Sequence, residues 1–255
     1  MARERYLVGA GEDTIHTGVI ELKTPRDKRR NWWFYHKTHL IVGIVGTIIL
    51  GSVIWSIVSK VEPDYTVGMI TSYNIPGEVM ESLENHLAQY ADDRNGDGRV
   101  VVQVSSYVFG NPASAEDMQA TQASYARFAG DATMASCILY IHDDAGFKSL
   151  GDSFQGFFQY NDGTAMPDTA WDYENAMRPW AEVPGLAAFT AQGNELSNWT
   201  PEVVQELCSR LRISVRTAEG SNIEKDEKKM AYYEDSMAML RRLEKDEKLP
   251  AAQGE

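Results

Sequence analysis

The longest apolar run in the hydropathy pattern extends from Thr38 to Ser59. These 22 residues include no Lys, Arg, Asp or Glu. At about 1.5 Å per residue, a helix of this length spans the roughly 30 Å hydrocarbon layer of a bilayer. Trp33 precedes the run and Trp55 lies near its end, and such rings favour the headgroup zone. The pattern predicts one transmembrane helix over residues 38–59.

A cleaved signal peptide is the alternative interpretation of this run, and three features oppose it. More than 30 residues precede the run, and acidic side chains are among them. The run is also longer than the core of a signal peptide, which has about 7–15 residues. The residues that follow, Ser59 to Pro63, lack a small-residue cleavage pattern. We therefore expect the helix to be retained as an anchor.

Downstream, apolar segments alternate with segments of helical period. Strands are expected at 65–72, 99–108 and 135–141, and helices at 78–93 and 115–129. Ser114 and Asp117 form a variant of the capping box at the start of the second helix. Continuous apolar strands separated by helices predict an α/β fold, a three-layer domain with a mainly parallel sheet. The order β-α-β-α-β is typical of the opening of a doubly wound fold.

The remaining third of the chain has a weaker pattern. Residues 145–195 are rich in aromatic side chains without a regular period, so we expect short strands and loops whose rings mostly pack in the core. A helix is predicted over Pro201–Arg210 and a late strand over Leu211–Arg216. The α/β domain would then occupy residues 62–220. Residues 221–249 read as a charged amphipathic helix, for which docking on the domain is favoured over partner binding.

Charge is divided unevenly between the two sides of the apolar run. Residues 1–60 carry nine Lys or Arg and five Asp or Glu, whereas the remainder carries 15 and 32. The positive-inside rule predicts a cytoplasmic tail over residues 1–37 and an extracellular C-terminal domain at the cell membrane. A domain this acidic is expected to repel nucleic acid. The basic residues closest before the run are Arg26, Lys28, Arg29, Arg30 and Lys37.

A loop after the first predicted helix matches the opening of an EF-hand. Asp93, Asn95 and Asp97 occupy alternate positions from which oxygens can converge on Ca²⁺, and the carbonyl of Arg99 would be a further ligand. The glutamate expected at the twelfth position is replaced by Val104. The alternative is a polar helix-to-strand turn without metal. The sequence leaves both open and predicts, at most, a structural Ca²⁺ site.

Polar residues also lie at the carboxyl end of each of the three predicted strands. In an open parallel sheet, ligands bind at the carboxyl ends of the strands, so these side chains are candidates to line one crevice. The alternative is that strand ends are polar in most α/β proteins, whatever they bind. The candidate ligand-binding residues are Ser72, Tyr73, Asn74, Ser105, Ser106, Tyr107, His142, Asp143 and Asp144.

The chain lacks the common enzyme motifs: there is no P-loop, no G-x-S-x-G and no H-E-x-x-H. His142 beside Asp143 could support acid–base chemistry, but no nucleophile is indicated, and no catalytic residue is predicted. Two cysteines, Cys137 and Cys208, do not make a disulfide scaffold, although one bridge is possible.

Small residues form a stripe along the predicted transmembrane helix. Gly43, Thr47 and Gly51 recur at four-residue spacing, which can let two membrane helices approach closely. Because glycine is common in membrane helices, the alternative of no dimer is favoured here. A homodimer through this stripe is a hypothesis.

Several stretches resemble a family. The opening MARERYLVGAGEDTIH, the entry NWWFYHKTHLIVGI, and the segments VEPDYTVGMI, DRNGDGRVVVQVSSY and DYENAMRPWAEVPGLA are similar to uncharacterised single-pass membrane proteins of clostridial-type Gram-positive bacteria. The resemblance covers about residues 1–190 and implies topology rather than activity. The β-α-β-α-β opening also resembles the first lobe of extracellular solute-binding proteins, although a second lobe would hardly fit in this chain.

These features favour a membrane-anchored extracellular binding module, solute-binding-like and stabilised by Ca²⁺, that presents an acidic crevice to a small ligand or to a membrane partner such as a transporter. The alternatives are a structural or accessory subunit of a membrane complex and, third, a degenerate hydrolase. An enzyme is less favoured than a binding protein.

Overall fold

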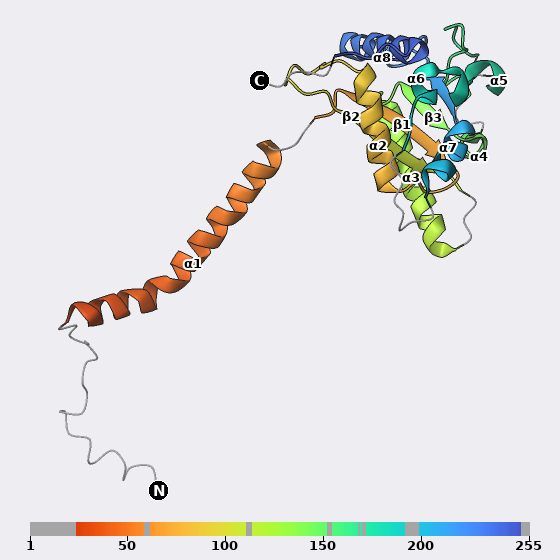
Figure 1. Cartoon of the computed structure of the whole chain (residues 1–255). Coiled ribbons are helices and arrows are strands. Elements are labelled where there is room, and N and C mark those ends of the chain that lie inside the picture. Colours follow the sequence, from red (N-terminus) through yellow and green to blue (C-terminus); the bar gives the residue numbers. More distant parts are fainter. Residues whose placement is uncertain are drawn as a thin grey trace, which may run out of the picture. The chain divides into compact units, whose positions relative to one another are not determined.

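The computed structural model describes residues 24–58, 62–110, 114–151, 155–167, 169, 172–191 and 199–250 (Figure 1). The chain divides into two compact units, Met1–Lys60 and Val61–Glu255.

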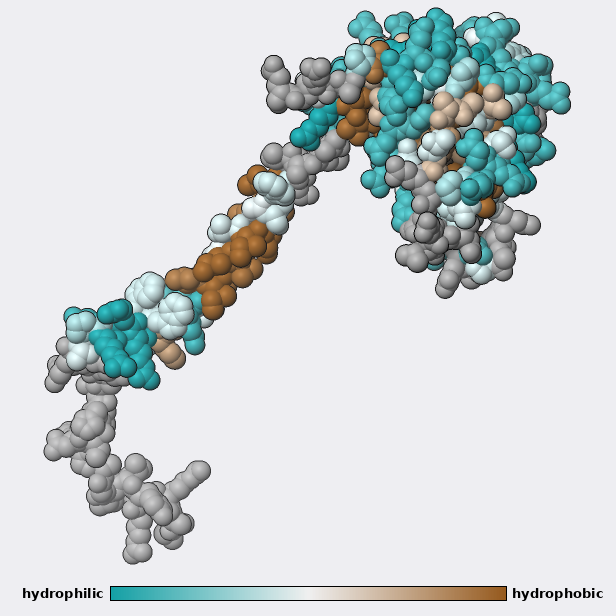
Figure 2. Space-filling view, viewed as in Figure 1, coloured by the Kyte–Doolittle hydropathy of each residue, from teal (hydrophilic) through white to brown (hydrophobic). Residues whose placement is uncertain are grey.

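The first unit contains one long apolar helix. Helix α1 spans Pro25–Val58, and its Lys28–Trp55 stretch is long and apolar enough to cross a membrane. None of the apolar window is buried against protein, and Figure 2 shows hydrophobic residues exposed along the helix. The helix begins at Pro25 rather than at Thr38, because proline is well suited to a first helical position and no helix breaker follows it. Residues 25–37, predicted as tail, are therefore helical.

The second unit is built on a five-stranded mixed sheet with strand order β2-β1-β3-β5-β4. Strands β1, β2 and β3 are mutually parallel, whereas β5 runs antiparallel to both β3 and β4. The three strands predicted first are thus parallel as expected, but the late strand reverses the direction of the chain. The strands are β1 (Tyr65–Thr71), β2 (Val102–Val108), β3 (Leu139–His142), β4 (Arg178–Pro179) and β5 (Arg212–Val215).

Helices connect and cover these strands, and their starts follow local signals. Ser114 and Asp117 form the predicted capping box of α3, and the Thr200 hydroxyl caps α7. The helices of the second unit are α2 (Gly77–Leu87), η3 (Ala88–Tyr90), α3 (Ala115–Met134), α4 (Asp144–Lys148), α5 (Tyr173–Ala176), η5 (Trp180–Glu182), α6 (Pro184–Ala187), α7 (Pro201–Ser209) and α8 (Glu227–Lys245).

Alternate residues of the strands enter two separate apolar clusters. Tyr65, Val67 and Met69 of β1 pack with side chains of α2, α6, α7 and α8. Ile70 and Tyr140 instead pack with side chains of α3, α4 and the 157–177 segment. Because successive side chains of a strand point to opposite faces, the sheet has an apolar contact on each face. The rings of Phe147, Phe158, Trp180 and Phe189 are buried, so their predicted role in core packing is confirmed.

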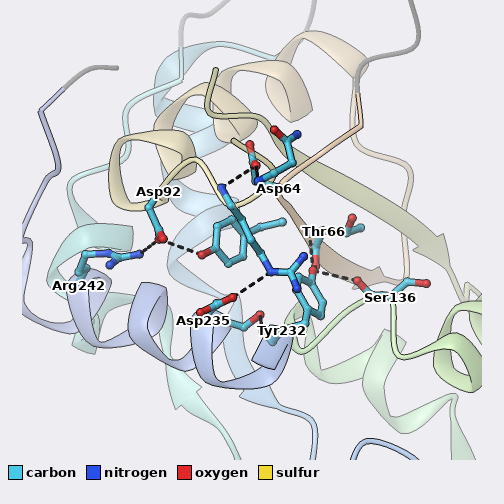
Figure 3. A network of polar contacts seen from close by, with 11 residues as sticks. Asp64, Thr66, Asp92, Ser136, Tyr232, Asp235 and Arg242 are labelled. Carbon is cyan, nitrogen blue, oxygen red and sulfur yellow. Dashed lines mark hydrogen bonds and ion pairs between the residues drawn. The ribbon is translucent and has the colours of Figure 1, made fainter. Parts of the chain in front are cut away.

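Helix α8 is docked on the second unit through apolar and polar contacts (Figure 3). Met239, Leu240 and Leu243 are buried in the first cluster. The Tyr232 hydroxyl accepts a hydrogen bond from the amide of Thr66 at 2.9 Å and donates to the carbonyl of Ser136 at 3.1 Å. Two ion pairs flank these contacts, Arg94–Asp235 at 2.9 Å and Arg242–Asp92 at 2.5 Å. The charged helix is thus part of the domain.

Candidate functional site

A cavity of about 650 Å³ lies where β1 and β3 end and β5 begins. We call it the strand-end pocket. It has the size of a small-molecule site. Its lining residues come from the ends of β1 and β3, from β4, and from the stretch that runs from the end of α7 into β5: Ser72, Tyr73, Asp143, Asp144, Ala145, Pro179, Leu207, Ser209, Arg210, Leu211 and Arg212.

Four of the predicted candidates meet in this pocket, namely Ser72, Tyr73, Asp143 and Asp144. One oxygen of Asp143 accepts hydrogen bonds from the Ser72 amide at 2.9 Å and from the Ser72 hydroxyl at 2.6 Å. The other oxygen accepts a hydrogen bond from the Gly146 amide at 2.5 Å and thereby caps the N-terminus of α4. The Asp143 carboxylate therefore joins two strand ends and accepts three internal hydrogen bonds, so its main role is to shape the pocket.

The Tyr73 phenol is the side chain of the pocket best placed to meet a ligand. It is half-buried and has no hydrogen-bond partner among the described residues. Burial and the nearby Asp143 carboxylate raise the pKa of Tyr73 to about 12, so the phenol is a neutral donor at physiological pH.

Two arginines that no sequence motif indicates, Arg210 and Arg212, also line the pocket. Arg212 pairs with Asp144 at 2.8 Å, and Arg210 forms an exposed pair with Glu206 at 2.5 Å. Arg210 follows α7 and Arg212 is the first residue of β5, and the antiparallel pairing of β5 with β3 brings both to this edge. The pocket therefore carries both signs of charge, rather than the acidic surface that the net charge of the domain suggests.

The remaining candidates lie elsewhere. Strand β2 continues to Val108, so Ser105, Ser106 and Tyr107 lie within the strand and not beyond its end. None of the three lines the pocket, and the Tyr107 hydroxyl donates to Asp131 at 2.6 Å. Asn74 is exposed outside the lining.

His142 is a core residue. It is fully buried, and its Nε2 lies 2.7 Å from the Oγ of the buried Ser214. Burial lowers the pKa of His142 to about 3, so the ring is neutral near pH 7. A Ser–His hydrogen bond can activate a nucleophile. A substrate cannot reach this pair, however, because both His142 and Ser214 are buried. Cys137 and Cys208 are both free thiols in the interior.

The predicted calcium loop is organised by its own backbone. The Asp93 carboxylate accepts hydrogen bonds from the amides of Gly96 and Gly98, at 2.7 and 2.8 Å. The Asp97 carboxylate accepts a hydrogen bond from the Arg99 amide. The buried Asp64 carboxylate accepts hydrogen bonds from the amides of Arg94 and Asn95. Among the described residues, no three His, Cys, Asp or Glu side chains gather as a metal site. The loop is thus held by internal amides, with Gly96 and Gly98 at positive φ.

Comparisons of the chain with protein-family models, with curated proteins and with solved structures found no match.

Proposed function

We propose that the chain is a membrane-anchored, extracytoplasmic binding module whose small polar ligand occupies the strand-end pocket. The observation that carries this proposal is the convergence of Tyr73, Asp144 and Arg212 from three chain segments on one cavity of ligand size.

The anchor in this proposal is α1, an apolar helix whose apolar stretch is not buried against the rest of the protein. Basic residues cluster on the N-terminal side of its apolar stretch, which favours a cytoplasmic N-terminus. The pocket-bearing unit would then face the outside of the cell, where a binding protein meets solutes or presents them to a membrane partner.

The lining indicates the chemistry of the ligand. A free phenol donor, a carboxylate and two guanidinium groups match a molecule that has both hydrogen-bond acceptors and donors, such as a zwitterion. Asp144 and Arg212 are paired with each other, so a ligand would exchange that partly exposed ion pair for its own contacts. A solvent-exposed ion pair contributes little free energy, so its replacement by contacts with a ligand costs little.

Thermal unfolding of the full chain in detergent, with amino acids and neutral sugars as separate probes, tests the proposal. We expect the zwitterions to raise the unfolding temperature and Tyr73→Phe to weaken the effect, because the variant removes the free donor. Tyr125→Phe is the matched control, since it also removes one hydroxyl but lies outside the pocket. Lack of response to every probe, or an equal response in both variants, would contradict the proposal.

A structural Ca²⁺ ion in the 93–99 loop remains a secondary proposal, supported by the spacing of Asp93, Asn95 and Asp97. Calcium would have to displace the hydrogen bonds that these side-chain oxygens accept from backbone amides. A Ca²⁺-dependent rise in unfolding temperature that Asp93→Asn removes is the expected result. If Ca²⁺ and Mg²⁺ leave the unfolding temperature unchanged, the loop is a metal-free turn.

A further inference from the structure

A second cavity, of about 770 Å³, is formed by residues remote from the strand-end pocket. We call it the Arg216 pocket. Its walls are the last turns of α3, two short pieces of the aromatic-rich segment, and the chain that follows β5. The lining residues are Ala129, Ala132, Thr133, Gln155, Gly156, Phe157, Ala165, Met166, Pro167, Arg216, Thr217, Glu219, Gly220, Ser221 and Asn222.

Arg216 is the unusual member of this lining. Its side chain is buried, with only 5% of the residue exposed. Its guanidinium lies 4.9 Å from the centre of the Phe157 ring, and its Nη2 donates to Asn222 Oδ1 at 3.0 Å. The backbone is held as well, because the Arg216 amide donates to the carbonyl of Ile138 at 2.9 Å. The position of the cation is therefore set by packing on several sides.

The guanidinium has no anionic counterpart among the residues that the structure describes. In the described part of the chain, Arg216 forms no ion pair, and its Nη1 is buried without a hydrogen-bond partner. Burial lowers the pKa of Arg216, yet arginine remains protonated at physiological pH. A buried cation without a partner is costly, and an apolar side chain of similar volume would avoid that cost. Core packing alone therefore does not account for an arginine here.

We propose that the Arg216 pocket binds the oxyanion group of a small molecule, a carboxylate or a phosphate, through Arg216. The free Nη1 and the remaining N–H of Nη2 form a donor pair that matches two oxygens of such a group. The ring of Phe157 covers one face of the guanidinium, so the anion is directed to the edge of the plane. This site is separate from the strand-end pocket and does not depend on the proposed function.

The rest of the pocket restricts the ligand further. The Ser221 hydroxyl is occupied by the Ala218 carbonyl and the Ile223 amide, and the Asn222 amide donates to Thr133. Phe157 and Met166 give apolar wall, whereas Glu219 is exposed and carries a negative charge. A ligand with one anionic group and an otherwise uncharged body fits this environment better than a polyanion, which Glu219 would repel.

The test measures thermal unfolding of the full chain in detergent with sodium phosphate and sodium acetate as separate probes, against sodium chloride at matched ionic strength. We expect one or both oxyanions to raise the unfolding temperature where chloride does not, and their difference identifies the preferred group. Arg216→Gln should weaken binding about tenfold or more, the loss expected for a charged hydrogen bond.

Two surface variants keep the test valid if Arg216→Gln fails to fold. Glu219→Gln removes a repelling charge from an exposed position and should strengthen the oxyanion response, whereas Ala129→Glu adds a charge at another exposed lining position and should weaken it. Tyr125→Phe, which lies outside both pockets, should leave the response unchanged. Absence of any oxyanion effect, or an effect that neither Glu219→Gln nor Ala129→Glu alters, would overturn the proposal.

Discussion

Gly68, in the middle of β1, lies against the ring of Tyr140 on the neighbouring strand β3. A Cβ at residue 68 would lie 2.5 Å from the Cε1 atom of Tyr140. Tyr140 is fully buried between Phe128, Phe157 and Phe158, so its ring has no room to withdraw. Glycine is required here for close packing and not for an unusual backbone conformation.

We predict that Gly68→Ala lowers the free energy of unfolding by about 1–3 kcal/mol, the usual cost of overpacking a core. Urea unfolding of the full chain followed by fluorescence measures this difference. Gly77→Ala, at the start of α2, is the control, because nothing lies within 4 Å of a Cβ at that residue. Equal stability of the two variants would show that the Tyr140 ring can move aside.

His142 makes stability depend on pH. Its pKa falls from 6.5 to about 3 on folding because the ring is buried, so the unfolded chain binds a proton that the folded chain excludes. The stabilisation of the folded state that results from this difference is fully present above pH 6.5. It is lost as the pH falls towards 3, by about 1.4 kcal/mol per pH unit. His86, whose pKa burial also lowers, acts in the same direction.

The prediction is that the free energy of unfolding of His142→Gln decreases less between pH 7 and pH 5 than that of the unchanged chain. Glutamine is neutral throughout this range and retains a donor for Ser214. Urea titrations at the two pH values give the comparison. An identical pH dependence in both proteins would show that other groups dominate the acid response.

At the scale of elements, α8 is tied to the sheet through Tyr232. Its hydroxyl satisfies the Thr66 amide and binds the Ser136 carbonyl, and its ring stacks on Tyr65 at 6.1 Å between centroids. Helix α8 also lies close to α6, where a Cβ on Gly185 would meet the backbone of Leu243. Two elements far apart in sequence are thus joined by buried contacts.

We expect Tyr232→Phe to cost about 1–3 kcal/mol of unfolding free energy, because it leaves the Thr66 amide without a partner. Hydrogen exchange of the α8 amides should accelerate with it. Arg94→Gln breaks the Arg94–Asp235 pair, which is 34% and 41% exposed, and should cost no more than about 1 kcal/mol. A larger effect of Arg94→Gln than of Tyr232→Phe would mean that surface charge, not the buried hydroxyl, holds the helix.

At the scale of the whole molecule, the proposal predicts which residues protease can reach on intact cells. Added protease should cleave within residues 62–250, and a tag on the N-terminus should remain protected until the cells are opened. The reason is the cost of moving the basic residues before the apolar stretch of α1 across the bilayer. Protection of the C-terminal unit with digestion of the tag would reverse the assignment and remove the binding proposal.

Dimerisation through Gly43, Thr47 and Gly51 also belongs to this scale and stays a prediction. The Thr47 hydroxyl donates to the Gly43 carbonyl within the same helix, so it offers no free donor to a neighbouring helix. Close packing of the small residues would have to supply the attraction. If the dimer exists, Gly51→Ile should abolish self-association in detergent crosslinking, while Ile54→Leu should not.

The local pattern was sufficient for features that depend on neighbouring residues alone. These are the apolar helix, the capping box at Ser114 and the positions of the first three strands. The parallel direction of those strands followed from the helices that connect them and not from the pattern within each strand. Four of the eleven lining residues of the strand-end pocket could be found in the same way, because Ser72, Tyr73, Asp143 and Asp144 directly follow strands. Period and end signals do not require knowledge of any distant contact.

Long-range pairing decided the rest. The direction of β5 cannot be read from an alternating pattern, which is the same for parallel and antiparallel strands, and that direction brings Arg210 and Arg212 to the pocket. It also determines where the chain continues, and hence the burial of Arg216 beside Phe157. A sequence shows that an arginine is present, but only the packed structure shows whether its charge has a partner.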